Sequence, residues 1–202
     1  TPSNSSAASD VYKRQYQQFV KSVSFVKRAV TLSDNFNYVF VGLRRVGKSY
    51  LMYQQIHHLI ETGISPEEIL FFNFEDERIA GMDTEHLDMI KRCYEEMYSH
   101  RPIFFLDEIQ IVPHWEQFVR RLADQKYRVY VTGSNAKMLS KDIATTLGGR
   151  FMIQYVYPFS FREYLSSNGV QLDKLWIYKN RSEVVRHFDT SVSYTHLTLP
   201  TN

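Results

Sequence analysis

The segment from Gly42 to Ser49, which reads GLRRVGKS, combines residue types that suit the binding of a polyphosphate. It fits the pattern G-x-x-x-x-G-K-[ST], in which the glycines let successive backbone amides turn toward one anion. Lys48 would add a point charge between two phosphates, and the Ser49 hydroxyl would ligate Mg²⁺. The alternative is a chance glycine turn before a helix, which the flanking elements disfavour.

The residues predicted to contact the nucleotide form one continuous stretch. They are Gly42, Leu43, Arg44, Arg45, Val46, Gly47, Lys48, Ser49 and Tyr50. Arg44 and Arg45 are interpreted as solvated loop residues whose backbone amides matter more than their side chains. Neither arginine is therefore given a catalytic role.

Two consecutive acids, Asp107 and Glu108, follow an apolar run within IFFLDEIQ. Asp107 would hold the water shell of Mg²⁺, since this cation keeps several waters and takes only one or two carboxylates. Glu108 would polarise an attacking water. Two acids with separate roles favour hydrolysis, whereas a solvated acidic turn after a strand is the structural alternative.

Three further residues are candidates for a catalytic role. Ser134 and Asn135, in VYVTGSN, would sense a terminal phosphate or position the water, although these residue types are also common in ordinary loops. Arg150 ends the glycine-rich turn TTLGGR and could stabilise transition-state charge, either on its own subunit's nucleotide or on a neighbour's. An arginine in a structural ion pair is the alternative for Arg150.

Apolar runs and helical patterns alternate along the chain, and these elements must position the candidate residues. Strands are predicted over residues 37–41, 69–74, 102–106, 127–132 and 151–156. Helices are predicted over residues 16–30, 50–61, 84–98, 115–125, 136–140 and 160–166. Strands separated by helices require a mainly parallel sheet covered on both faces, so the sequence predicts an α/β three-layer sandwich.

The composition is that of a globular protein. The chain has 202 residues, of which 44% are hydrophobic, and a formal net charge of +2, which is too small to imply a polyanionic partner. Cys93 is the one cysteine, so no intrachain disulfide can form and a reducing compartment is expected. No apolar run approaches the roughly 20 residues of a membrane helix, so no membrane contact and a cytoplasmic location are predicted.

The two ends of the sequence differ from its middle. Residues 1–15 and 191–202 resemble translated sequencing-adapter fragments and are expected to be non-native tails. Genuine flexible termini are the alternative. The expected organisation is then one domain over residues 16–166, followed by residues 167–190 as the start of a truncated lid or C-terminal region.

The chain resembles a widespread bacterial and archaeal family of AAA-type P-loop ATPases whose C-terminal half is a separate domain. The resemblance covers about residues 16–165 and is carried by several motifs together. They are GLRRVGKSYLM, FFNFEDER, FFLDEIQ followed by Trp115, VTGSN, ATTLGGR and PFSFREYL. It implies a five-stranded sheet of order 5-1-4-3-2, with the glycine loop and Asp107–Glu108 as Walker A and Walker B motifs. It also implies ATP and Mg²⁺ as ligands and hydrolysis as the reaction, but no downstream task.

Three functions stay open at this point. The leading one is a Mg-ATP hydrolase, in which Arg150 would act across the interface of a homo-oligomer if it acts in trans. The second is a nucleotide-dependent switch or scaffold with negligible turnover, which the pair of acids disfavours. The third is a DNA-associated ATPase, supported locally only by a modest basic patch at Arg120, Arg121, Lys126 and Arg128.

Overall fold

The computed structural model describes residues 22–79, 81–98, 100–134, 138, 142–170, 182 and 184–187. The chain divides into two compact units. The larger unit comprises Thr1–Phe25 and Thr31–Val156, and the smaller one comprises Val26–Val30 and Tyr157–Asn202.

A parallel sheet forms the centre of the larger unit. Its strands are β1 (Asn37–Val41), β2 (Ile69–Asn73), β3 (Ile103–Asp107), β4 (Val129–Gly133) and β5 (Phe151–Tyr155). They lie in the order β2-β3-β4-β1-β5, and every neighbouring pair runs parallel. This confirms the order that the family resemblance implied, and it brings the carboxyl ends of β1, β3 and β4 to one edge of the sheet.

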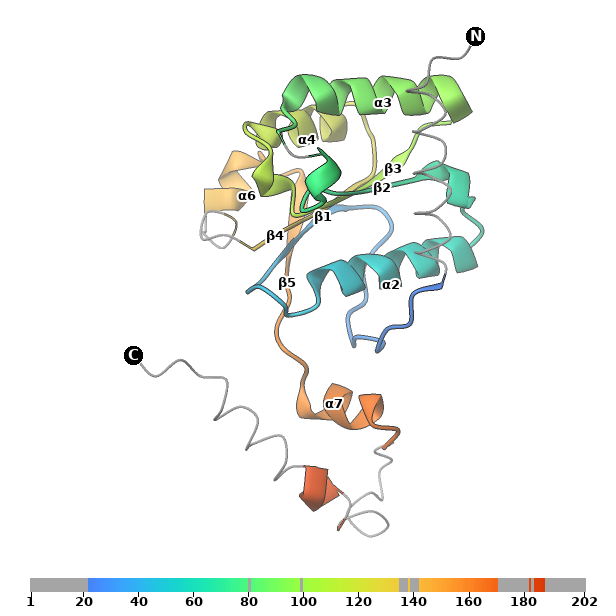
Figure 1. Cartoon of the computed structure of the whole chain (residues 1–202), viewed down its shortest axis with the longest axis vertical. Coiled ribbons are helices and arrows are strands. Elements are labelled where there is room, and N and C mark those ends of the chain that lie inside the picture. The colour runs from blue at the N-terminus through green and yellow to red at the C-terminus, as the bar shows by residue number, and fades with distance from the viewer. Residues whose placement is uncertain are drawn as a thin grey trace. The chain divides into compact units, whose positions relative to one another are not determined.

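Helices cover both faces of the sheet. The longer ones are α2 (Lys48–Glu61), α3 (Thr84–Tyr98) and α4 (Trp115–Asp124), with the short α6 (Asp142–Thr146) after β4. Helix α2 lies on one side of the sheet, and α3 and α4 lie on the other (Figure 1). The predicted three-layer sandwich is therefore confirmed. In the described part of the chain, every helix is too short or too polar to span a bilayer.

Side chains alternate between the two faces of each strand, as a buried parallel sheet requires. Val39 and Val41 of β1 belong to the core cluster that includes α3 and α4. Tyr38 points to the other face, where it stacks on Tyr130 with 5.9 Å between ring centroids. On that face Gln55 of α2 donates to the Tyr130 hydroxyl at 3.3 Å. The apolar runs read from the sequence are thus fully buried in β3 and β4, whereas β5 at the edge of the sheet is partly exposed.

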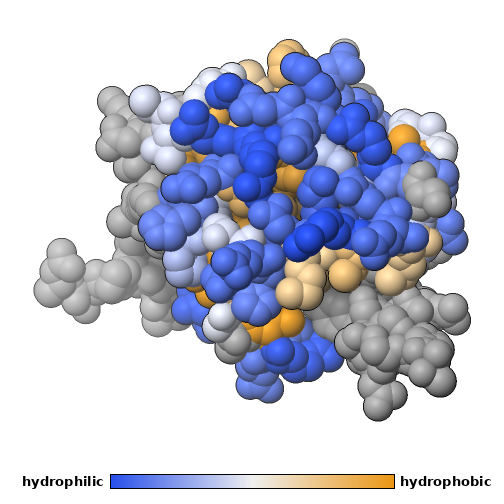
Figure 2. All heavy atoms as spheres, turned by 90° about the horizontal axis from the view of Figure 1, so that it is seen from above, coloured by the Kyte–Doolittle hydropathy of each residue, from blue (hydrophilic) through white to orange (hydrophobic). Residues whose placement is uncertain are grey.

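Helix α3 separates its apolar and polar sides, as a surface helix should. Leu87 and Tyr94 are buried against the core. The outward surface, seen from above in Figure 2, is mostly hydrophilic with small hydrophobic areas between the polar groups. Met89, 52% exposed, is one apolar side chain of α3 that faces solvent.

The smaller unit joins two distant segments of the chain. Its helix α7 (Phe161–Ser167) begins with a capping box, in which Ser160 Oγ accepts from the Glu163 amide and Glu163 Oε2 accepts from the Ser160 amide. The Arg28 Nε donates to Glu163 Oε1 at 2.9 Å, and its Nη2 donates to the Tyr157 carbonyl at 2.7 Å. A buried arginine thus holds the segment that precedes α7.

Two of the predicted helices need comment. The helix predicted over residues 16–30 is wrong for residues 23–30, which have no helical structure. Tertiary contacts explain this, because Arg28 bonds to groups more than 100 positions away and the non-helical segment places it there. Of the helix predicted over 136–140, only Met138 lies within the described residues.

β1 has the predicted bounds, and the boundaries of the other strands differ from the predicted ones by one or two residues, as helix and strand ends commonly do. The consequential shift is in β3, which extends to Asp107 instead of ending at residue 106. Asp107 is therefore part of the ladder, in register with Asn73 of β2. The helix predicted from residue 50 begins earlier, at Lys48.

Candidate functional site

The glycine loop leaves β1 and turns directly into α2. At Gly42 the backbone passes close to the residue that follows β5, since a Cβ at Gly42 would lie 2.4 Å from the Val156 carbonyl oxygen. Gly47, the N-cap of α2, has a φ of 92°, a left-handed conformation that glycine adopts at least cost. Within the described residues no side chain caps this helix end. The partial positive charge of the helix N-terminus therefore faces the loop.

Lys48 lies where the loop meets the end of β3. It is only 4% exposed. Its Nζ donates to the Leu43 carbonyl at 3.1 Å and lies 3.2 Å from Glu108 Oε1. The lysine that ends the glycine loop and the acid that directly follows β3 thus lie together in one buried place.

Thr132, at the end of β4, connects the two acids. Its Oγ1 donates to Asp107 Oδ1 at 2.5 Å and accepts from the Glu108 amide at 2.8 Å. Glu108 has a φ of 53°, which is left-handed and unusual for a residue with a side chain. The chain turns sharply after β3, and the threonine hydroxyl satisfies the backbone at that turn.

The Asp107 carboxyl group is hard to ionise in this position. Burial raises its pKa above the ordinary value, and the charge of Glu108 acts in the same direction. Hydrogen bonds from the Thr132 and Ser49 side chains, and the charge of Lys48, oppose this increase. The contact with Ser49 also joins the first turn of α2 to the carboxylate of β3.

Both oxygens of the Glu108 carboxylate have donors. Ser134 Oγ donates to Oε2 at 2.8 Å, and Gln110 Nε2 donates to the same oxygen at 2.6 Å. Lys48 lies next to Oε1. Ser134, one of the candidates from the sequence, is therefore brought into the site, whereas Asn135 lies outside the described residues.

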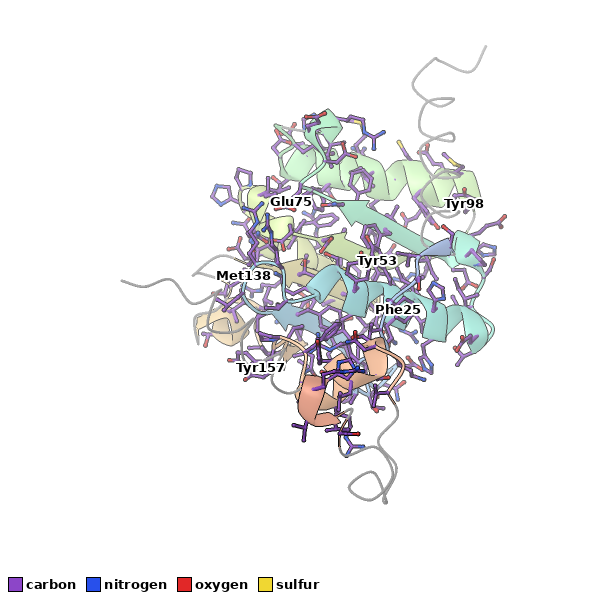
Figure 3. All side chains as sticks on the ribbon, turned by 60° about the horizontal axis from the view of Figure 1, so that its bottom comes forward. Phe25, Tyr53, Glu75, Tyr98, Met138 and Tyr157 are labelled. Atoms are coloured by element: carbon purple, nitrogen blue, oxygen red, sulfur yellow. The ribbon has the colours of Figure 1, made fainter. Side chains whose placement is uncertain are left out.

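The surrounding residues of the loop are more exposed. The Arg44 Nη2 lies 3.2 Å from Glu75 Oε1, and the two side chains are 77% and 46% exposed. Arg45 has a φ of 65°. Leu43 and Tyr50 are exposed large side chains. Figure 3 shows Glu75 at the end of the larger unit where Met138 also lies, far from Tyr98 at the other end.

Comparison with known proteins identifies the family. Residues 34–165 match the family described as AAA domain. The chain belongs to this family. It is 31% identical over 156 residues to an uncharacterized protein of Methanocaldococcus jannaschii. That alignment covers 77% of this chain and 34% of the relative. It is 35% identical over 179 residues to an uncharacterized protein of Haemophilus influenzae, covering 87% of this chain and 42% of the relative.

This chain thus spans about a third to two fifths of the length of these curated relatives. Among solved structures, the AMPPCP-bound DnaA of Aquifex aeolicus aligns with a TM-score of 0.46 and 13% identity. That alignment covers 93% of this chain and 61% of the DnaA chain.

Arg150 lies away from the other candidate residues of the AAA domain. It directly precedes β5, whose first residue, Phe151, is in register with Asn37 at the start of β1. The glycine loop instead follows Val41, at the other end of β1. The Arg150 side chain forms an ion pair with Asp124, and its Nη1 donates to the Gly148 carbonyl at 3.1 Å. Arg150 therefore lies at the opposite edge of the sheet from Lys48.

The buried groups of the site suit a hard divalent cation. Two carboxylates, Asp107 and Glu108, meet one ammonium group, Lys48, and the Ser49 hydroxyl hydrogen-bonds to Asp107. An excess of negative oxygen ligands and a hydroxyl match the preference of Mg²⁺. The described residues contain no cluster of three or more acids, histidines and cysteines that could hold a metal by itself. Oxygens of a bound phosphate would have to complete such a site.

Sequence reasoning missed two residues of this site, Thr132 and Gln110. Thr132 was included in the strand over residues 127–132, but its neighbours could be known only from the pairing of β3 with β4. One signal was present, because a hydroxyl at the end of a strand beside the Asp107 strand shares its sheet edge. Gln110 carried no signal, since its contact depends on the left-handed turn at Glu108.

Proposed function

We propose that this chain binds ATP with Mg²⁺ at the edge of the sheet formed by the glycine loop, β3 and β4, and hydrolyses it. The observation that carries the proposal is the 3.2 Å approach of Lys48 Nζ to Glu108 Oε1. In-line hydrolysis needs a phosphate-binding lysine and a carboxylate able to accept a proton from water within one site. Membership of the AAA domain family supports nucleotide binding.

In the proposed reaction, the amides of residues 42–49 and the Lys48 ammonium bind the phosphate chain. A water attacks the γ-phosphorus while the bond from that phosphorus to the β–γ bridging oxygen breaks. Glu108 accepts the proton of the water, and ADP and inorganic phosphate leave. Lys48 stabilises the charge that develops on the transferred group.

Ser49 and Asp107 would hold the magnesium ion, directly or through its water shell. When bound, this ion supplies positive charge next to the phosphate oxygens. Ser134 would position the Glu108 carboxylate, to which it donates a hydrogen bond. Asn135 is proposed to sense the terminal phosphate.

Arg150 is proposed to act on a neighbouring subunit. Its position before β5, across the sheet from Lys48, argues against contact with the nucleotide of its own chain. A homo-oligomer would bring the arginine of one subunit to the phosphates of the next.

Measurements of phosphate release by the wild type and two variants test the proposal. Lys48→Ala should lose ATP binding, because it removes the charge that faces the phosphates. Glu108→Gln should keep binding but release phosphate at least about 100-fold more slowly, the usual contribution of a general base. Equal release from all three proteins would overturn hydrolysis at this site. Tight binding without turnover in the wild type would instead favour a nucleotide-dependent switch.

A further inference from the structure

Gln110 lies in η3 (Ile109–Ile111), directly after the candidate catalytic carboxylate. Its Nε2 donates to Glu108 Oε2 at 2.6 Å. Ser134 Oγ donates to the same oxygen, while Lys48 Nζ lies beside the other oxygen of the carboxylate. Three side chains from three parts of the chain therefore hold the Glu108 carboxylate in one orientation.

The other end of the Gln110 amide is unusual. Its Oε1 is buried and, within the described part of the chain, has no hydrogen-bond partner. A buried acceptor without a donor costs free energy. Reversing the amide would not remove this cost, because an oxygen would then face the carboxylate oxygen of Glu108 at 2.6 Å. The contact with Glu108 therefore determines how the amide is oriented.

Gly133, the last residue of β4, provides the space that Gln110 occupies. A Cβ at this position would lie 2.7 Å from Gln110 Oε1 and 2.5 Å from Met138 Cε. Both distances are shorter than real Cβ contacts, so a side chain at Gly133 would displace both Met138 and Gln110. The need for glycine here is one of space next to Gln110.

We propose that Gln110 is a positioning residue that sets the direction of the Glu108 carboxylate toward the attacking water, and that Gly133 keeps it in place. The inference rests on the proposed hydrolysis. Packing alone does not account for an amide at this position, since an apolar side chain would fill the space without burying an unpaired acceptor. The N–H donor is the group that an apolar residue cannot replace.

The variant Gln110→Met separates positioning from packing. It removes the donor and also the unpaired acceptor while keeping an unbranched side chain, so Tm should not fall. The kcat should fall by roughly tenfold to hundredfold, as expected when a reacting group loses its orientation. The KM and the Kd for ATP should change by less than about twofold, because among the described residues the Gln110 amide donates to Glu108 and not to the glycine loop. Gln117→Met, on the exposed side of α4, is the matched control and should behave as the wild type.

Gly133→Ala provides an independent variant. It should lower kcat similarly by displacing Gln110, and the double variant with Gln110→Met should be little slower than either single one. A Gln110→Met protein with wild-type kcat, alongside a slow Glu108→Gln protein, would overturn the positioning role alone. A fall in kcat that comes with a lower Tm, or that Gln117→Met shares, would assign Gln110 to packing and also overturn it. A wild type without turnover would overturn the proposed function, and the positioning role with it.

Discussion

Lys48 and Glu108 neutralise each other in the chain on its own, with 3.2 Å between Nζ and Oε1. Both side chains are almost fully buried, so neither is well solvated. A triphosphate that binds the lysine must therefore compete with the carboxylate for it. When the nucleotide binds, Lys48 leaves Glu108 for the phosphates, and the Glu108 carboxylate becomes available to the attacking water.

The first prediction follows from this competition. Glu108→Gln removes the negative charge that competes for Lys48, so ATP should bind roughly tenfold more tightly than to the wild type, about 1.4 kcal/mol. Titration of a fluorescent ATP analogue at constant Mg²⁺ measures the affinity. Glu96→Gln, an exposed change on α3, is the control and should leave it unaltered. Unchanged or weaker binding to Glu108→Gln would contradict the competition.

The second prediction concerns Thr132, which donates to Asp107 and accepts from the Glu108 amide. Thr132→Val keeps the shape but removes two buried hydrogen bonds, which should cost about 1–3 kcal/mol of unfolding free energy. Its hydrogen bond also lowers the pKa of Asp107, so its loss should raise that pKa further. Asp107 would then stay protonated to higher pH, and the acid limb of the pH–rate profile should shift to higher pH. Denaturant unfolding and rates from pH 5 to 8 test both effects, and a profile that stays in place would exclude the link to Asp107.

At the level of elements, the strands were predictable because a parallel sheet buries both faces and leaves uninterrupted apolar runs such as residues 103–106. Their order in the sheet came from family resemblance, since apolar runs do not encode which strand pairs with which. The position of Arg150 could have been deduced as well. It precedes its strand whereas the glycine loop follows one, and in a parallel sheet these are opposite edges.

The third prediction concerns α7 and its capping box. Partial burial acts to raise the pKa of Glu163, but hydrogen bonds from Ser160, Ala29 and Arg28 outweigh it and leave the pKa below its ordinary 4.5. A depressed folded-state pKa means that the carboxylate stabilises the fold fully above that ordinary value and loses this effect as pH falls through the folded value. Glu163→Gln should therefore lower Tm at pH 6, and the difference from the wild type should shrink in acid. A difference that persists at pH 3 would contradict the role of the charge.

Ser160→Ala tests the same helix end without touching the ion pair. Losing the N-cap hydroxyl should cost about 1 kcal/mol. The part of this cost that comes from losing the acceptor of the Glu163 amide should remain at low pH. The part that comes from losing the hydrogen bond to the Glu163 carboxylate should shrink as that group is protonated. The two variants together thus separate the cap from the contact with Arg28, and thermal unfolding of both at two pH values measures each.

At the level of the whole molecule, Arg150 and Lys48 lie at opposite edges of one sheet, so two subunits are needed for them to share a nucleotide. Arg150→Ala should lower kcat by roughly 1,000-fold, the lower end of what such an arginine contributes. Mixing it with Lys48→Ala should restore part of the activity, since each variant supplies what the other lacks. Phosphate release from the mixture, compared with each variant alone, is the measurement. If the mixture released phosphate no faster than the sum of the two variants measured alone, action of Arg150 on a neighbouring subunit would be excluded. Its role would then be the structural ion pair with Asp124.

The smaller unit also bears on how this protein should be divided for experiments. The family match begins at residue 34, whereas the arginine that binds Glu163 and the Tyr157 carbonyl is at position 28. A fragment limited to the matched region would contain the Glu163 carboxylate and the Tyr157 carbonyl but lack Arg28, which donates to both. These two acceptors would then have to accept hydrogen bonds from water. Fragments intended for binding or kinetic work should therefore begin before Val26, so that the first and last segments of the fragment remain tied to each other.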